Sequence, residues 1–313
     1  MTSIALLLPE RARLGGTLPA VAGAALGRAD REQADAGGRA QLRRHFRLLP
    51  DHWPAAALTR QADAPGDATG AVWLRADPAH VAPDLNGARL LGWGEGLGLG
   101  AEDAQALLPA LRPLFGDAGF LLDAPHPARW YLRLPEGTRL PDFAAPEEAV
   151  GEDLFLALPQ GDDALARRWR ALITEVQVVL HQHPWNGERA AQGKVAINSL
   201  WFWGGGVAPD AVQSRYMNVR SPDALLQALA RAAGAAMTAP QTTAMATGDS
   251  LVDLRHLRSL EVFVRHVLPP LLESMAQGEY DTLTLDFEDG ARFHLRRGQR
   301  WRLWRRPLAA LAG

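Results

Sequence analysis

The chain has 313 residues, enough for one large domain or two ordinary ones, and its 47% hydrophobic and 22% charged residues are typical of a globular protein. The formal net charge of −2 argues against general nucleic-acid binding and against a strongly basic membrane-facing surface. The chain has no cysteine, which excludes disulfides, iron–sulfur ligation and thiolate zinc sites.

The first residues, Met1 to Leu8, are apolar but lack the basic start of a signal peptide. No run approaches the ~18 consecutive apolar residues of a membrane span. We therefore expect a cytoplasmic protein that does not enter a membrane.

Hydrophobic periodicity and turn residues predict strands that alternate with helices. Strands are expected at residues 4–8, 71–74, 88–91, 130–134, 154–158 and 195–203. Helices are expected at 102–114, 165–181, 222–234 and 250–276, the last interrupted or kinked at Pro269-Pro270, and a looser helix within 15–40. Asp162 and Asp163 stand where a helix start favours acidic residues, and a β-hairpin is expected at 282–296.

This order of elements predicts an α/β fold with a central mixed sheet flanked by helices, in two lobes. A stretch rich in Gly, Pro and Asp at 61–70 is typical of a linker and suggests a lobe boundary. We expect residues 1–65 to form the N-terminal part of the main lobe. Residues 66–160 then form an α+β lobe, and residues 161–313 form the C-terminal part of the main lobe.

Polar residues are concentrated in the segment HQHPWNGERAAQGKVAINSLWFWGGG, from His181 to Gly206, which includes Lys194, the single lysine of the chain. The segment joins polar groups to a short apolar run that ends in three glycines. Such a combination is typical of a ligand site at a sheet edge. A tight turn that leads into a core strand, with the tryptophans as packing, is the alternative.

The pattern HPWN-x2-R-x3-GK-x2-IN-x2-WFWGGG resembles a motif of the archaeal-type cofactor-independent phosphoglycerate mutases. Upstream, WLRADPAHV (73–81) and ARWYLRL (128–134) are similar, in the same order, to the preceding region of those enzymes. The resemblance covers about residues 70–210, so the 66–160 lobe would correspond to part of the mutase substrate side. Over its whole length the chain resembles the RpfE-type regulatory proteins of proteobacteria.

The resemblance implies an alkaline-phosphatase-like fold, in which catalysis needs two divalent metals held by Asp and His, and a Ser or Thr nucleophile. The matching ligands are missing here. The first strand runs into Pro9-Glu10-Arg11, where the family has a metal-binding Asp, and the pair Asp51-His52 is out of order. In the C-terminal third, the set of residues that comes nearest to such a ligand pattern is Asp286, Asp289 and His294. These residues fall on the predicted hairpin, where we expect turn and solvent-facing side chains. We therefore predict no catalytic residue, no metal ligand and no cofactor.

The resemblance also implies ligand contacts from side chains of the substrate-side region. These candidates are Arg129, His183, Asn186, Arg189, Lys194, Asn198, Trp201 and Trp203. Guanidinium groups suit phosphate or carboxylate, a lysine adds a point charge, and an asparagine can orient a hydroxyl. Trp201 and Trp203 lie two residues apart, on one side of a strand, which also fits core packing.

Two further patterns have ordinary alternatives. Gly96, Gly98 and Ala101 match G-x-G-x-x-A, which occurs in dinucleotide-binding turns but also in any glycine-rich loop between a strand and a helix. The arginine-rich tail with Trp301 and Trp304 could grip nucleic acid. Alternatively its arginines protect an edge strand, paired with nearby acids, while the tryptophans pack inward.

We predict a regulatory or binding protein, a degenerate phosphoglycerate-mutase-like pseudoenzyme that takes a small anionic or phosphorylated ligand. An unidentified protein partner fits this role, whereas nucleic acid and membrane are not expected. The alternatives are an active cofactor-independent phosphoglycerate mutase or related metal-dependent phosphotransfer enzyme, and a nucleic-acid-binding regulator.

Overall fold

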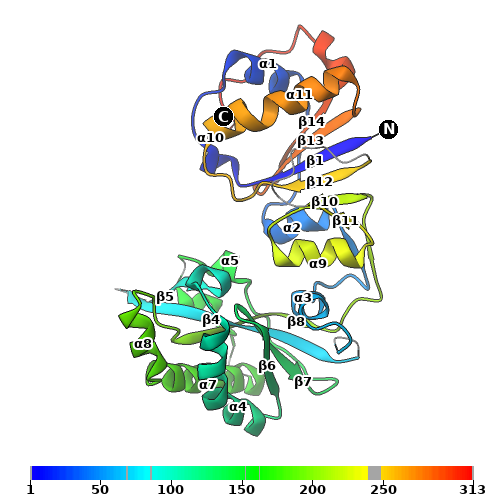
Figure 1. The fold of residues 1–313 in the computed structure, drawn as a ribbon. Coiled ribbons are helices and arrows are strands. Elements are labelled where there is room, and N and C mark those ends of the chain that lie inside the picture. The colour runs from blue at the N-terminus through cyan, green and yellow to red at the C-terminus, as the bar shows by residue number, and fades with distance from the viewer. Residues whose placement is uncertain are drawn as a thin grey trace. The chain divides into compact units, whose positions relative to one another are not determined.

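The computed structural model describes residues 2–67, 70–84, 87–151, 153–161, 163–238 and 248–311. Two compact units are present, and the predicted class is confirmed: mixed α/β, with sheets flanked by helices (Figure 1). Unit 1 comprises Met1–Leu49 and Ala211–Gly313, and unit 2 comprises Pro50–Asp210.

These bounds differ from the predicted lobes at 1–65, 66–160 and 161–313. The reason is a long-range strand pairing, in which β4 (Val72–Asp84) and β8 (Ser199–Gly206) lie side by side in one sheet. Residues 161–210 therefore belong to the same unit as the middle of the chain, whereas the residues from Ala211 on belong to unit 1. The proposed linker at 61–70 begins inside α3 (Ala55–Asp63), so the chain does not change unit there.

The described strands of unit 1 form a sheet in the order β11-β10-β12-β1-β13-β14-β2. Their bounds are β1 (Ser3–Leu8), β2 (Asp30–Gln33), β10 (Asn218–Arg220), β11 (Ala236–Met237), β12 (Ser250–Asp253), β13 (Thr282–Phe287) and β14 (Ala291–Arg296). From β11 to β13 neighbouring strands are parallel, whereas β14 and β2 are added antiparallel. β13 and β14 form the predicted hairpin. A separate pair, β3 (Arg47–Leu49) with β9 (Ala211–Gln213), completes the unit.

Helices flank both faces of this sheet (Figure 1). They are α1 (Ala20–Arg28), α2 (Gly38–Arg43), α9 (Ala224–Ala232), α10 (Leu260–Val262) and α11 (Leu268–Gln277), with short turns η1 (Arg11–Leu14), η3 (Phe263–Val267) and η4 (Arg297–Trp301). Alternate residues of β1 and β13, among them Leu6, Leu8, Leu285 and Phe287, pack with α1 and α11 into one core. Fully burying each such side chain stabilises the fold by about 1.5–3 kcal/mol.

The predicted helix at 250–276 is correct only in its second half. Residues 250–253 form strand β12, which pairs with β1 and β10, and helix begins at Leu260. The predicted interruption of the helix is present near Pro269 and Pro270, because the π-helical turn η3 separates α10 from α11. The two prolines lie at the start of α11, directly after a π-helical turn, where a missing backbone N–H costs little.

The C-terminal segment packs directly on α1. Gly23 and Gly27 lie one turn apart, and a Cβ built on either would come within 2.4 Å of the Leu308 oxygen or 2.3 Å of the Arg306 oxygen. The backbone N–H of Leu308 donates to the Gly23 carbonyl at 2.9 Å. Only glycine permits this approach, so these two residues seat the tail on the helix.

Unit 2 is built on a sheet in the order β5-β4-β7-β6, with β8 also paired to β4. Its other strands are β5 (Gly87–Trp93), β6 (Leu121–His126) and β7 (Arg129–Leu134), and its helices are α3, α4 (Ala101–Asp117), α5 (Pro146–Ala149), α6 (Leu154–Ala157), α7 (Ala164–His181) and α8 (Trp185–Ala191), with the short turn η2 (Gly94–Leu97). The helices predicted at 102–114 and 165–181 are confirmed as α4 and α7. Asp163 caps α7 by accepting from the Ala166 N–H at 2.7 Å, while Asp162 lies outside the described residues.

Two local predictions in unit 2 are wrong. Residues 154–157 form the short helix α6 instead of a strand, with Asp153 accepting from the Phe155 N–H at 3.0 Å. Strand β8 begins at Ser199, so residues 195–197 lead into it without joining it. No described helix is both long and apolar enough to cross a lipid bilayer.

Candidate functional site

Two buried acids lie at the carboxyl ends of the parallel strands of unit 1. Asp253 of β12 and Asp286 of β13 are both in register with Leu7 of β1, one on each side. Residues paired in this way point to the same face of the sheet. Ligands of open α/β sheets bind outside these carboxyl ends, so this edge is the candidate site that the topology favours.

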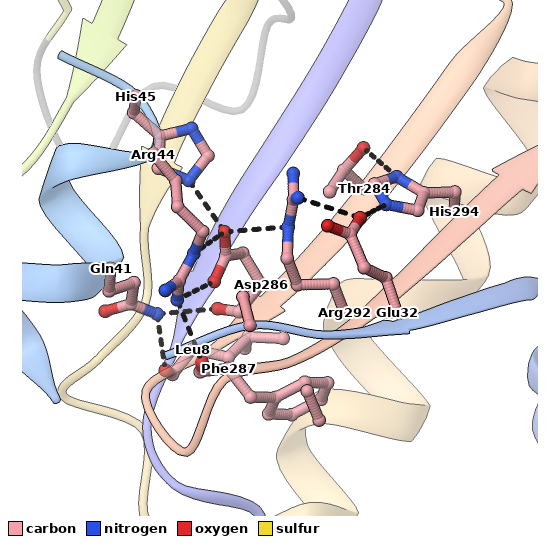
Figure 2. Close-up of polar contacts among 12 residues, drawn as sticks. Leu8, Glu32, Gln41, Arg44, His45, Thr284, Asp286, Phe287, Arg292 and His294 are labelled. Atoms are coloured by element: carbon pink, nitrogen blue, oxygen red, sulfur yellow. Dashed lines mark hydrogen bonds and ion pairs between the residues drawn. The ribbon is translucent and has the colours of Figure 1, made fainter. Parts of the chain in front are cut away.

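Asp286 is fully buried and is surrounded by basic side chains (Figure 2). Arg44, directly after α2, donates to both carboxylate oxygens, through Nη2 at 2.6 Å and Nε at 3.0 Å. The ring of His45 contacts Oδ2 through Nε2 at 2.9 Å. Arg292, the cross-strand neighbour on β14, places its Nε 3.3 Å from Oδ2.

The backbone beneath this cluster is held by α2 as well. The side chain of Gln41 donates through Nε2 to the carbonyl oxygens of Leu8 and Asp286, at 3.0 and 2.6 Å. Leu8 and Asp286 lie at the carboxyl ends of the neighbouring strands β1 and β13, so the Gln41 amide binds the backbone of both strands there (Figure 2). The carboxylate is therefore fixed by its backbone and by its side chain.

The protonation of this cluster follows from burial and charge. Burial alone would raise the pKa of the Asp286 carboxyl, but hydrogen bonds from His45 and Arg44 outweigh it and hold this pKa below its usual range. Burial lowers the pKa of His45 despite its bond to Asp286. A neutral ring fits its partners, with Nε2–H donating to Asp286 and Nδ1 accepting from the Tyr216 hydroxyl at 2.9 Å.

Alternating charges continue across the sheet from Asp286. Arg292 donates to Glu32 of β2 at 3.0 Å, and Glu32 also contacts His294 Nε2 at 3.2 Å. The other ring nitrogen of His294 lies 3.1 Å from the Thr284 hydroxyl. These residues are cross-strand neighbours on β13, β14 and β2, so the carboxylates and the cations neutralise one another (Figure 2).

Asp253 is neutralised in the same manner. Arg255 donates to its two oxygens at 2.9 and 2.7 Å, and the Ser221 hydroxyl donates at 2.7 Å. Burial raises the pKa of Asp253, but the bonds from Arg255 and Ser221 lower it further than burial raises it. Both acids at this edge are therefore ionised and already paired.

This donor set does not fit the two divalent metals that the mutase resemblance implies. Arg44 and His45 donate to both carboxylate oxygens of Asp286, and a divalent cation would also have to approach the guanidinium groups of Arg44 and Arg292. Among the described residues, no group of three or more His, Asp or Glu side chains is placed to hold a metal ion. His52 contacts backbone carbonyls, those of Pro50 and Val207, through its two ring nitrogens.

Asn186 and Arg189, two predicted ligand residues after α7, form hydrogen bonds within the protein. Asn186 donates to the carbonyls of Leu180 and Ile197 and accepts from the Ile197 N–H. Arg189 is only 1% exposed and donates to Asp103, a buried acid on α4, at 2.7 Å. It also reaches the carbonyls of Leu97 and Val195.

The remaining polar candidates of this segment differ in the number and length of their hydrogen bonds and ion pairs. Asn198 pairs with both backbone groups of Val81 in β4, at 2.8 and 2.7 Å. His183 accepts from the Trp185 N–H at 3.2 Å. Lys194 is 33% exposed and lies 3.9 Å from Glu102, so it has the loosest contact of the set.

Arg129 and the two tryptophans each have partners within the protein. Arg129 donates to both oxygens of Asp63, at 2.8 and 2.7 Å, and to Glu95 at 2.7 Å. Trp203 donates to Asp77 at 2.8 Å, and Trp201 to the Ala144 carbonyl at 3.0 Å. Both rings are buried, as core packing predicts. None of these contacts tests ligand binding, which stays a prediction.

The glycine-rich turn lies where the sequence places it, between β5 and α4. Gly98 adopts a left-handed conformation with φ +60°, which explains a glycine at that position. However, β5 pairs antiparallel with β4, whereas a dinucleotide-binding turn belongs to a parallel βαβ unit. The turn therefore lacks the surroundings of that fingerprint.

The C-terminal arginines are partly paired, with acids of β2 and β13. Arg302 donates to Asp30 at 2.5 Å, and Arg292 pairs with Glu32 and Asp286. The tryptophans do not pack inward: Trp301 and Trp304 are 68% and 75% exposed. β14 is not an edge strand either, because β2 covers it.

Comparisons with known proteins give partial matches. No protein-family model matches the chain. A probable 2,3-bisphosphoglycerate-independent phosphoglycerate mutase of Geobacter sulfurreducens is 39% identical over 64 residues, and the corresponding enzyme of Methanosarcina mazei is 41% identical over 64 residues. Each match covers 20% of this chain and 16% of the enzyme, so it spans about one sixth of those relatives.

Solved structures of similar shape span most of the chain. A cofactor-independent phosphoglycerate mutase from Thermoplasma acidophilum has a TM-score of 0.43 and 15% identity, covering 95% of this chain and 90% of its own. A protein from Pyrococcus horikoshii has a TM-score of 0.47 and 13% identity, covering 94% and 87%. The similarity to phosphoglycerate mutases therefore rests on the 64-residue matches to the curated enzymes.

Sequence reasoning missed the cluster around Asp286. It treated Asp286 as a turn residue facing solvent, which is wrong, because α2 covers that face of the sheet. Arg44 and His45 were not singled out at all. An adjacent arginine and histidine after a short amphipathic stretch gave no local signal, since their partner lies more than 240 residues away.

Proposed function

We propose that this protein is a binding or regulatory protein on a phosphoglycerate-mutase-like scaffold, and that it does not catalyse metal-dependent phosphoryl transfer. The observation that carries the proposal is the pairing of Asp286 with Arg44, His45 and Arg292. A carboxylate that serves a metal needs free lone pairs, whereas this one already accepts hydrogen bonds from Arg44 and His45 and lies 3.3 Å from the Arg292 guanidinium. The similarity to mutases over 64 residues supports the scaffold, and the regulatory role follows the resemblance to RpfE-type proteins.

Two measurements on the full chain test this proposal. In a coupled mutase assay with manganese, cobalt or magnesium, we expect no turnover above a blank, while an authentic cofactor-independent mutase serves as positive control. Calorimetric titration with manganese should show no stoichiometric binding. Metal-dependent turnover that disappears in Asp286→Ala but survives in Asp289→Ala would establish the enzyme alternative instead.

The ligand in this proposal is a small anionic or phosphorylated molecule. Of the predicted contacts, Lys194 has the most freedom to meet one, since its intramolecular partner is 3.9 Å away. An anion at about 100 times its dissociation constant would add about 2.7 kcal/mol to stability. In a thermal-shift screen of inorganic phosphate and phosphoglycerates, Lys194→Ala should lose the shift, and the exposed control Arg112→Ala should keep it. A screen without any shift would remove the anionic ligand from the proposal.

A nucleic-acid-binding regulator is a second candidate, favoured by the exposed rings of Trp301 and Trp304 between arginines. Stacking on such rings contributes about 1–3 kcal/mol per base. An electrophoretic shift with single-stranded DNA or RNA at physiological salt, weakened in a Trp301→Ser, Trp304→Ser double variant, would support it. Absence of any shift would dismiss it.

A further inference from the structure

A pocket of about 190 Å³ opens in unit 1 between α1, α11, the end of β14 and η4. Its floor is apolar and is formed by Ala25, Leu272, Met275 and Leu295. Leu295 belongs to the sheet face that packs on α1 and α11, whereas Asp286 faces α2. The pocket is therefore distinct from the paired carboxylates at the strand ends.

Arginines surround this apolar floor. The pocket is lined by Arg28 of α1, Arg296 at the end of β14, and Arg297 and Arg300 of η4. Arg296 lies 3.9 Å from Asp30, a carboxylate held more closely by other side chains.

The other three arginines have no acidic partner among the described residues. Arg297 donates to the Ala276 carbonyl at 3.2 Å, and Arg300 lies over the Trp301 ring at 5.0 Å. No ion pair is found for Arg28 within the described part of the chain. Such guanidinium groups are free to take up an anionic head from outside.

We propose that this pocket binds a small organic anion that carries one alkyl or aryl group and one carboxylate or phosphate head. The apolar floor takes the hydrocarbon, and the arginines pair with the head. Sites for whole drug-sized ligands occupy roughly 300–1,000 Å³, so about 190 Å³ fits one hydrocarbon group instead of a nucleotide. The proposal does not depend on the function proposed above.

Calorimetry of the full chain with straight-chain carboxylates, each below its micellar concentration, tests the proposal. Affinity should rise about fourfold per added methylene over the first members of the series, and then level off when the pocket is filled. Decanol, which has the same chain without the charge, should bind at least tenfold more weakly than decanoate. Decyl phosphate replaces the carboxylate and identifies which head is preferred.

Variants locate the binding. Ala276→Phe fills the pocket from an exposed position of α11 and should abolish decanoate binding, whereas Gln277→Phe, its exposed neighbour outside the pocket, should not. Arg300→Glu should weaken binding about tenfold or more, whereas Arg305→Glu should leave it within twofold. Circular dichroism melting curves confirm that each variant is folded.

Several outcomes would overturn the proposal. One is the absence of binding by every carboxylate and phosphate of the series, and another is equal binding of decanol. Retention of full affinity in Ala276→Phe would place the ligand elsewhere. If the protein sediments with anionic lipid vesicles but does not bind free decanoate, the pocket is part of a membrane-docking surface and not a site for a free ligand.

Discussion

Replacing Asp286 by asparagine should remove the centre of the unit 1 cluster without changing its shape. Asparagine keeps one acceptor oxygen but turns a donor toward Arg44 or His45, and it leaves the Arg44 charge without its carboxylate, while Arg292 keeps only Glu32. Removing one partner of a buried ion pair typically costs about 3–5 kcal/mol. Since Asp286 is fully buried and Arg44 nearly so, we expect a loss in that range.

The matched control is Asp289→Asn, the same substitution on the hairpin turn. Asp289 pairs with Arg11 at 2.7 Å, but both side chains are about a quarter exposed, and such surface pairs contribute at most about 1 kcal/mol. In thermal unfolding, Asp286→Asn should lower the melting temperature by roughly 6–20 °C, and Asp289→Asn by less than about 4 °C.

The pH dependence gives an independent check. The pKa of Asp286 is lower in the folded than in the unfolded state, where it lies near 4. Its contribution is therefore present above pH ~4 and is lost as pH falls through the folded-state pKa. The stability difference between the wild type and Asp286→Asn should shrink below pH ~4. Equal losses in the two asparagine variants, or a difference that persists at low pH, would refute the assignment of Asp286 as the centre of the cluster.

Three further predictions concern other parts of the chain. Arg189→Ala should destabilise the protein by about 3–5 kcal/mol, because its buried pair with an acid on α4 is broken, whereas Lys194→Ala should cost less than about 1 kcal/mol in urea unfolding. Gly27→Ala should cost about 1–3 kcal/mol, since its Cβ would meet a carbonyl oxygen of the C-terminal segment, whereas Gly116→Ala, in open space within α4, should stabilise by about 0.5–1 kcal/mol. Burial lowers the pKa of His45 in the folded state. Because the unfolded state binds a proton near pH 6.5 that the folded state does not bind, stability should fall below that pH by up to about 1.4 kcal/mol per pH unit. His45→Gln should remove that part of the slope, and unchanged pH curves would contradict the buried neutral ring.

Local pattern was enough for the amphipathic helices and the hairpin of this chain. The apolar stripes of α4 and α7 repeat every three to four residues, and the Glu-Asp-Gly turn fixes the hairpin that follows β13. It was not enough for residues 154–157, where LFLA lacks any period. Phe155 and Leu156 are exposed there, so no core face selects a strand.

The features that the sequence did not reveal depend on contacts between segments that are far apart in the chain. Ser250–Asp253 is a strand because β1 and β10 flank it, and both are far away in the chain. Asp286 is buried because α2, formed by residues 38–43, closes over it. No local window contains both partners, and therefore neither feature could be read from spacing alone.

Carboxylates that are buried or nearly buried in both units are matched by arginines from distant segments. The pairs are Asp286 with Arg44, Asp63 with Arg129 and Asp103 with Arg189. Such a pair adds little stability over an apolar replacement, but breaking it is costly, so each arginine is committed to its internal anion. An external anion would have to displace a carboxylate to reach Arg129 or Arg189, although the mutase resemblance suggests both as ligand contacts. The cations best able to bind a ligand are those without an internal carboxylate, and among the described residues these include Arg28, Arg297 and Arg300 around the apolar pocket.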